Sequence, residues 1–170
     1  MNLFSKCIPV ILKHEGGYQN NPNDLGNWVG GYKTGKLVGT KYGIAARFFP
    51  DEDIPNLSEE RAKQLYFRYY WIPMNLDGIC REASALEIFD FGVNAGKRRA
   101  IRTAQRICGV TADGVVGPVT TNAINNYDGD FVQDYKHSRR VYYEWIAEKR
   151  DNYEFLQGWL NRVDNTKFKA

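Results

Sequence analysis

The feature that most constrains how this chain folds is the point where its first apolar stretch ends. Apolar residues recur at the three- and four-residue spacing of one helix face, at Leu3, Phe4, Cys7, Ile8, Ile11 and Leu12. Glu15 continues that face, and Gly16 and Gly17 follow it. Because glycines can adopt the positive φ angles that end a helix, we predict Glu15 in the last helical turn, anchored from behind and open in front. Apolar neighbours and the negative end of the helix dipole are expected to raise the pKa of a carboxyl at that position, as a general acid requires. The alternative is that Glu15 only caps a surface turn.

A second carboxylate and a threonine follow at positions from which they can flank a sugar ring. Asp24 lies nine positions after Glu15, beyond a turn-forming run at residues 19–23, and a Gly-rich segment then leads to Thr40. Glycoside hydrolysis needs one carboxyl to protonate the leaving oxygen and another group to stabilise the oxocarbenium ion or to position water. Glu15, Asp24 and Thr40 are therefore the candidate catalytic residues.

Several short motifs occur along the chain in a fixed order. They are residues 14–18 (HEGGY), 21–24 (NPND), 40–44 (TKYGI), 70–73 (YWIP) and 89–96 (FDFGVNAG). Together they resemble the glycoside hydrolase 108 family of muramidases, which is found among phage endolysins. The DGVVGP sequence at residues 113–118 is similar to a turn in the peptidoglycan-binding half that usually follows in this family. The resemblance covers nearly the whole chain.

The resemblance implies a lysozyme-like N-acetylmuramidase that cuts the β-1,4 bond between N-acetylmuramic acid and N-acetylglucosamine in peptidoglycan glycan strands. The family's catalytic glutamate falls on Glu15. The spacing from Glu15 to Asp24 matches that of phage-type lysozymes, in which a threonine, here Thr40, completes the site. The link between Asp24 and Thr40 is longer here than is usual. Within the same motifs, Tyr18 and Tyr42 are expected to contact substrate. Two alternatives remain, a non-catalytic cell-wall-binding module and a chitinase-like glycosidase.

The helical spacing disappears between Asn27 and Ile44, where a β-hairpin is predicted. Thr34 and Gly35 are placed to turn a chain that runs out from Trp28 and back to Tyr42. Such a hairpin would form one wall of a sugar-binding cleft, with the Trp28 or Tyr32 ring facing the substrate. The alternative is an exposed loop whose aromatic residues have no binding role.

The rest of the chain reads as helices, so we predict a mainly α, lysozyme-like fold with a small β-hairpin near the active site. Ser58 caps a helix that Pro73 stops, and further helices are expected over residues 83–93, 97–109, 131–146 and 155–163, with a short one from Pro118. Asp90, close to the apolar side of the helix at residues 83–93, and Asn94, just after it, are expected to support substrate binding; the alternative for Asp90 is a solvated position or a salt bridge. Residues 1–96 form the expected catalytic part, and residues 97–170 a helical, peptidoglycan-binding-like part packed with it as one body.

Composition limits the partners. A net charge of +3 suits an anionic cell wall, but the basic residues are too dispersed for a nucleic-acid-binding protein. Two histidines and the absence of HExxH and CxxC motifs argue against a zinc enzyme, so no metal or cofactor is expected. The three cysteines are expected to be free thiols.

The sequence also carries expectations about location. We expect no signal peptide and no membrane insertion, because Pro9 and the charged residues after it interrupt the first apolar stretch. A monomer is expected that stays in the host bacterial cytoplasm until it is released to the periplasm or cell wall. Like the endolysins it resembles, it would then need a separate membrane-permeabilising protein to reach peptidoglycan.

Overall fold

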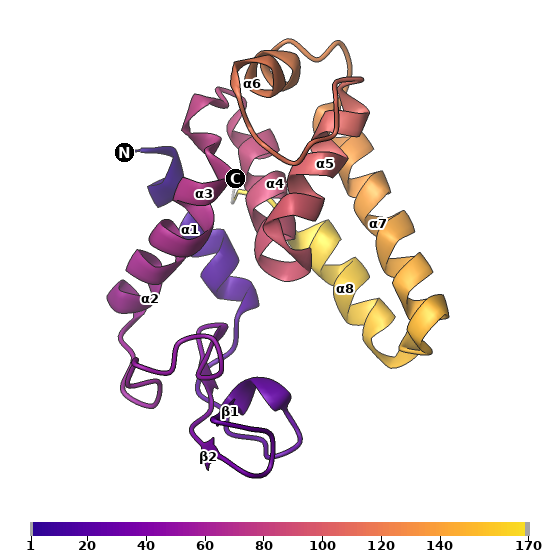
Figure 1. Ribbon diagram of the computed structural model, residues 1–170. Helices are drawn as coiled ribbons and strands as arrows, with labels where there is room; N and C mark the ends of the chain where they lie inside the picture. The colour runs from indigo at the N-terminus through magenta and orange to yellow at the C-terminus, as the bar shows by residue number, and fades with distance from the viewer. Residues whose placement is uncertain (1, 169–170) are drawn as a thin grey trace. The chain divides into compact units, whose positions relative to one another are not determined.

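The computed structural model describes residues 2–168, and most of them are helical (Figure 1). The helices are α1 (Leu3–His14), α2 (Glu59–Tyr66), α3 (Ile72–Met74), α4 (Glu82–Ala95), α5 (Lys97–Ile107), α6 (Pro118–Asn125), α7 (Phe131–Arg150) and α8 (Tyr153–Asn165). The strands are β1 (Trp28–Val29), β2 (Lys36–Leu37), β3 (Thr40–Lys41) and β4 (Ile44–Ala45). The prediction of a mainly α, lysozyme-like fold is confirmed.

Contacts divide the chain into two compact units. One, here called the hairpin unit, is Ile11–Phe67. The other, here called the helical unit, consists of the described residues of Met1–Val10 and Arg68–Ala170. Helix α4 packs against α5 and α7 within the helical unit.

Most helix ends follow the local chemistry of the sequence. The Ser58 side chain accepts a hydrogen bond from the Arg61 N–H at 3.1 Å and caps α2, as expected. Pro73 does not stop the helical path, because α2 continues through a π-helical turn (Phe67–Trp71) into α3. Pro73 lies in α3 one residue before its end at Met74, and Trp71, two residues earlier, already has α-helical backbone angles (φ −63°, ψ −55°). The chain leaves α3 at Asn75, which has a left-handed φ of 51°.

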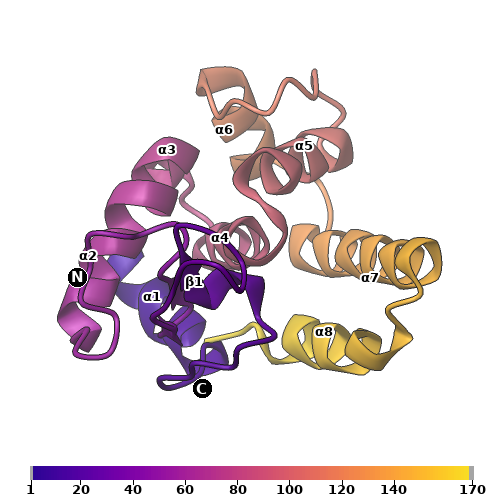
Figure 2. The ribbon, with the colours of Figure 1, turned by 60° about the horizontal axis from the view of Figure 1, so that its bottom comes forward.

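The helical unit is closed by α7 and α8, which lie side by side in both views (Figures 1 and 2). Under α7, Phe91 of α4 makes edge-to-face contacts with Tyr135 and Tyr143. The three cysteines, Cys7, Cys80 and Cys108, are free thiols.

A buried ionic cluster links α4 to α7. Arg139 has no exposed surface and bridges Glu87 and Asp90, with an N···O distance of 2.5 Å to each. Lys136 lies 3.4 Å from Glu87. Burial raises the pKa of the Glu87 carboxyl to about 7, and the opposing attraction of Arg139 and Lys136 limits that rise. Glu87 and Asp90 are thus part of the internal packing of the helical unit.

The hairpin unit contains two short antiparallel hairpins, whereas the sequence suggested one. In the expected hairpin, β1 pairs with β2 in the register Trp28 to Leu37. A Cβ on Gly35 would lie 2.0 Å from the Val29 carbonyl oxygen, so the connecting turn accepts only glycine there. The second hairpin pairs β3 with β4 in the register Thr40 to Ala45. Its strands have two residues each, too few to show the alternation by which strands are recognised.

Candidate active site

Glu15 is the first residue after α1 and is half-buried. Its N–H donates to the Leu12 carbonyl at 3.2 Å, which continues the helical turn. The expected role of the two glycines in ending the helix is wrong: neither Gly16 nor Gly17 has a positive φ. The chain instead leaves α1 beside β3, where the Gly16 carbonyl accepts from the Tyr42 N–H at 3.0 Å. This hydrogen bond fixes the backbone next to Glu15.

The Glu15 carboxyl lies against the turn of the β3–β4 hairpin. A Cβ on Gly43 would be 2.6 Å from Glu15 Oε2 and 2.4 Å from Tyr66 Oη, so these groups converge on one point. Tyr66 is buried, and its hydroxyl donates to the Tyr42 carbonyl at 2.9 Å. Tyr42 has a φ of 51° and Gly43 of 72°, the left-handed pair that a two-residue hairpin turn favours. Glycine at position 43 therefore leaves the space that the carboxyl occupies.

Thr40 and Asp24 are joined by a hydrogen-bond network through two amide side chains. The Thr40 hydroxyl donates to Asn27 Oδ1 at 2.7 Å, and Asn27 has no exposed surface. Asn27 Nδ2 donates to Gln19 Oε1 at 2.8 Å, and Gln19 Nε2 donates to Asp24 Oδ2 at 2.9 Å. The other Asp24 oxygen accepts from the Gly26 N–H at 2.8 Å. Asp24 is therefore held at both oxygens, and Thr40 is oriented by a buried partner.

The same hairpin connects this network to Glu15. Thr40 lies two residues before the Tyr42–Gly43 turn, a separation of roughly 7 Å along a strand. Gln19 and Thr40 exchange backbone hydrogen bonds of 2.9 and 2.8 Å, so the segment after Glu15 runs alongside β3. The three candidate catalytic residues are thus carried by one small, mutually hydrogen-bonded substructure.

Aromatic side chains surround this substructure. The Tyr18 hydroxyl donates to the Val38 carbonyl at 2.8 Å, and 43% of Tyr18 is exposed. Trp28 is half-buried, donates from Nε1 to the Pro22 carbonyl at 3.0 Å and meets Tyr32 edge to face. Tyr42 is half-buried in its left-handed turn. Rings that are anchored at one end and partly exposed offer apolar faces to a sugar.

Asp90 and Asn94 belong to the helical unit. Asp90 is completely buried and accepts from Arg139, Arg162 and Thr166 at distances of 2.5 to 3.1 Å. A carboxylate without exposed surface cannot contact substrate, so the expected binding role of Asp90 gives way to a structural one. Asn94 is exposed, and its Oδ1 accepts from the Tyr143 hydroxyl at 2.5 Å.

Sequence reasoning did not assign roles to four residues of this substructure: Gln19, Asn27, Gly43 and Tyr66. Gly43 and Tyr66 are close in space to Glu15 but far from it in sequence. Gly43 is part of the TKYGI motif, and that motif was the one feature of the sequence that could have indicated its place in the site. Gln19 and Asn27 stand among turn-forming residues, and nothing in their spacing distinguishes them from ordinary loop amides.

Among residues 2–168, no group of three or more His, Cys, Asp or Glu side chains is arranged to hold a metal ion. The described part of the chain also contains no helix with the length and apolar character needed to cross a bilayer.

Comparisons with known proteins identify two family matches and a similar fold. Residues 8–96 match the family described as Glycosyl hydrolase 108, and residues 99–164 match the family described as Predicted Peptidoglycan domain. No curated protein sequence matches the chain. A solved structure titled "Structure of Brucella abortus SagA" has a similar fold, with a TM-score of 0.74 and 24% sequence identity. The match covers 96% of this chain and 90% of that one.

The first family match spans more than half of the chain and includes Glu15, Asp24 and Thr40. The second follows it directly and supports peptidoglycan as the partner. The protein is a peptidoglycan-directed glycosidase, and the chain belongs to the glycosyl hydrolase 108 family.

Proposed function

We propose that this protein is an N-acetylmuramidase in which Glu15 is the general acid. The observation that carries the proposal is the packing of the Glu15 carboxyl against Gly43 beside the Tyr66 hydroxyl. A general acid must lie within hydrogen-bonding reach of the glycosidic oxygen, and the residues around it must restrain its side chain in that position. The end of α1, the glycine turn and the buried tyrosine together supply that restraint.

Asp24 and Thr40 have different tasks in this proposal. Asp24 accepts hydrogen bonds at both oxygens and is exposed, so its negative charge has a fixed position from which it stabilises the oxocarbenium-like transition state. The Thr40 hydroxyl gives its hydrogen to Asn27, which leaves the oxygen lone pairs to accept a hydrogen bond from water. Thr40 is thereby suited to hold the attacking water.

The substrate is proposed to be the β-1,4 bond between N-acetylmuramic acid and N-acetylglucosamine. Tyr18, Trp28 and Tyr42 would line the sugar-binding surface with their partly exposed rings. The family membership and the matched peptidoglycan domain support this choice of polymer.

The Glu15→Gln substitution tests the acid. It keeps the shape of the side chain and its contact with Gly43 but removes the acidic proton that the carboxyl would transfer to the glycosidic oxygen. We expect release of dye from labelled peptidoglycan sacculi to fall by at least about 100-fold, the scale of a lost general acid. Unchanged thermal unfolding would exclude a folding defect. A folded Glu15→Gln protein that digests sacculi at the wild-type rate would rule out Glu15 as the acid.

We also propose, from the resemblance of its motifs to phage endolysins, that the protein acts in host lysis and depends on a membrane-permeabilising protein for access. Expression in bacterial cytoplasm should then be tolerated, and culture turbidity should drop when chloroform opens the inner membrane. Prompt lysis without chloroform would contradict this dependence. No lysis under either condition, with soluble protein present, would count against the muramidase assignment.

A further inference from the structure

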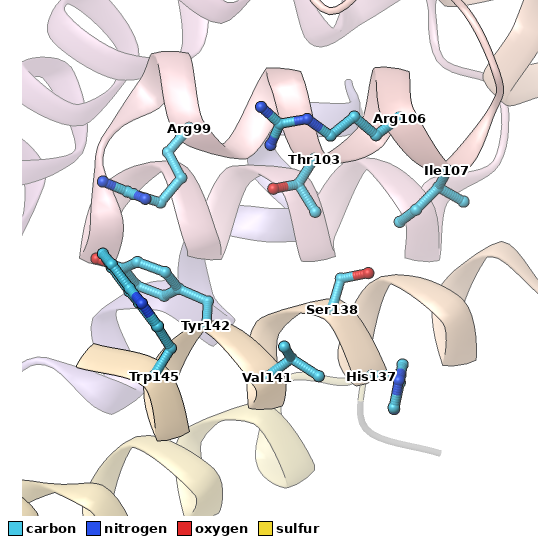
Figure 3. A pocket seen from close by; sticks show the side chains of 9 residues that line it. All are labelled: Arg99, Thr103, Arg106, Ile107, His137, Ser138, Val141, Tyr142 and Trp145. Atoms are coloured by element: carbon cyan, nitrogen blue, oxygen red, sulfur yellow. The ribbon is translucent and has the colours of Figure 1, made fainter. Parts of the chain in front are cut away.

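A groove of about 520 Å³ lies between α5 and α7 in the helical unit (Figure 3). Arg99 and Arg106 line it from α5, and His137, Ser138, Tyr142 and Trp145 line it from α7. All its lining residues fall within residues 99–164, the stretch that matches the peptidoglycan domain. Neither Glu15 nor any other residue of the hairpin unit lines the groove, so it is a separate site.

The groove carries positive charge that the protein itself does not neutralise. Arg106 is exposed and has no ion pair or side-chain hydrogen bond with any residue from 2 to 168. Arg99 is also exposed, and within residues 2–168 its side chain contacts the Tyr142 ring, whose centroid lies 4.3 Å from the guanidinium carbon. No aspartate or glutamate side chain is among the lining residues. An anionic ligand would therefore meet two arginines that have no competing carboxylate in the groove.

Aromatic surface lies beside this charge. Trp145 is 47% exposed, and its ring is tilted against that of Tyr142 at a centroid distance of 6.1 Å. Figure 3 shows Arg99, Tyr142 and Trp145 gathered at one end, with Arg106 further along α5. Seven residues separate the two arginines, a distance of roughly 10 Å along a helix. That length accommodates more than one sugar ring.

A second cavity extends the groove. It has a volume of about 390 Å³, shares Arg99 and Tyr142 with the first, and adds Arg150 and Asn94. The stacked pair of Arg99 and Tyr142 therefore separates two adjoining hollows, each of which contains a further arginine. An elongated ligand can cross this pair and contact arginines on both sides.

We propose that this groove is a second peptidoglycan site, distinct from the Glu15 site, which holds a glycan strand through its sugars and stem-peptide carboxylates together. The exposed Trp145 ring stacks on a sugar face, the Tyr142 ring holds the Arg99 guanidinium in place, and Arg99, Arg106 and Arg150 pair with the carboxylates. The choice of polymer rests on the proposed function. The arginines of the groove would distinguish peptidoglycan from chitin, because the chitin chain has similar sugars but no carboxylates.

The site also differs from a general polyanion surface. Single-stranded nucleic acid can use aromatic rings and arginines too, but it requires positive charge along the whole path of its backbone. Here the arginines are separated by about two helical turns, with Thr103 and Ser138 between them. That spacing suits an anion on every second sugar better than a phosphate at every residue.

Binding of the full-length Glu15→Gln protein to insoluble sacculi tests the proposal, because this background is expected to leave the polymer intact. Arg106→Gln and Trp145→Ala are added separately, and each should weaken sacculus binding by about tenfold, the scale of one lost charge-assisted hydrogen bond or stacking contact. Two matched controls in the same unit, Arg81→Gln and Tyr153→Ala, remove an exposed arginine and an exposed ring outside the groove and should bind like the parent.

Three further measurements complete the test. Raising the ionic strength from about 0.05 M to about 0.5 M should weaken binding by the parent more than binding by Arg106→Gln. Chitin should bind at least about tenfold more weakly than sacculi, and single-stranded DNA should not displace the protein from sacculi. The proposal is overturned if the groove variants bind like the controls, or if chitin binds as well as sacculi. Displacement by single-stranded DNA would instead identify a polyanion site. None of these failures would alter the hydrolysis products of the wild-type protein, on which the proposed function depends.

Discussion

Gly43→Ala is the substitution whose effect follows most directly from the geometry around Glu15. The new Cβ would lie 2.6 Å from Glu15 Oε2 and 2.4 Å from Tyr66 Oη, well inside van der Waals contact. It would also force alanine into a φ near 72°, which costs an L-residue about 1–2 kcal/mol. Overpacking of this kind adds about 1–3 kcal/mol. The carboxyl, the hydroxyl or the turn must therefore move.

The expected outcome has two parts. The combined cost of about 2–5 kcal/mol should lower the melting temperature by roughly 4–20 °C, given about 2–4 °C per kcal/mol for a protein of this size. Hydrolysis of sacculi at a temperature where the variant is folded should fall by about 100-fold, because a displacement of the acid by about 1 Å suffices for such a loss. Activity is followed by dye release and folding by thermal unfolding.

Gly16→Ala is the matched control. It lies next to Glu15 in sequence, its φ is not positive, and a Cβ there would contact nothing within 4 Å. Its stability should change by less than about 1 kcal/mol and its activity by less than about twofold. Adding Tyr66→Phe to Gly43→Ala removes the hydroxyl clash, but it also removes the 2.9 Å hydrogen bond to the Tyr42 carbonyl and leaves the clash with Glu15 Oε2, so activity should stay low. The reasoning is refuted if Gly43→Ala retains activity within about twofold, or if Gly16→Ala loses as much.

Four further substitutions probe the rest of the structure. Thr40→Ala and Asp24→Asn should each lower kcat by about 10- to 100-fold and leave sacculus binding unchanged, as steady-state kinetics and pull-down would measure; a loss of binding with unchanged kcat would contradict their transition-state roles. Asn27→Ala should lower the free energy of unfolding, measured by urea denaturation, by about 1–3 kcal/mol, because it removes the buried amide that connects Thr40 to Gln19. Wild-type stability in this variant would show that the network contributes little. Between about pH 4.5 and 7 the folded protein keeps a proton on Glu87 that the unfolded chain releases, so the free energy of unfolding should fall by up to about 3 kcal/mol as the pH rises. Glu87→Gln should remove that slope, and an identical slope in the variant would exclude Glu87 as its source.

Features set by local sequence were predictable. The apolar spacing predicted Glu15 at the end of α1, Ser58 predicted the start of α2, and Pro118 predicted the start of α6. Each depends on residues within one or two helical turns. The Thr34–Gly35 turn was equally local, and it produced the expected β1–β2 hairpin.

Features set by distant partners were not predictable in the same way. Asp90 was expected to support substrate binding, and its position near the apolar side of its helix was equally compatible with a salt bridge. It is completely buried and pairs with Arg139 and Arg162, which lie 49 and 72 residues away. The contact of Glu15 with Gly43 and Tyr66 likewise joins three segments that no periodic pattern relates. Long-range ion pairs and hydrogen bonds of this kind are decided by the packed fold and leave no trace in local spacing.

Mass spectrometry of the fragments released from purified peptidoglycan tests the central claim most directly. Wild-type protein should release fragments whose new reducing ends are all N-acetylmuramic acid, and folded Glu15→Gln should release essentially none over the same period. New reducing ends on N-acetylglucosamine, cleaved stem peptides, or the same fragments from Glu15→Gln would contradict a muramidase that uses Glu15 as its acid.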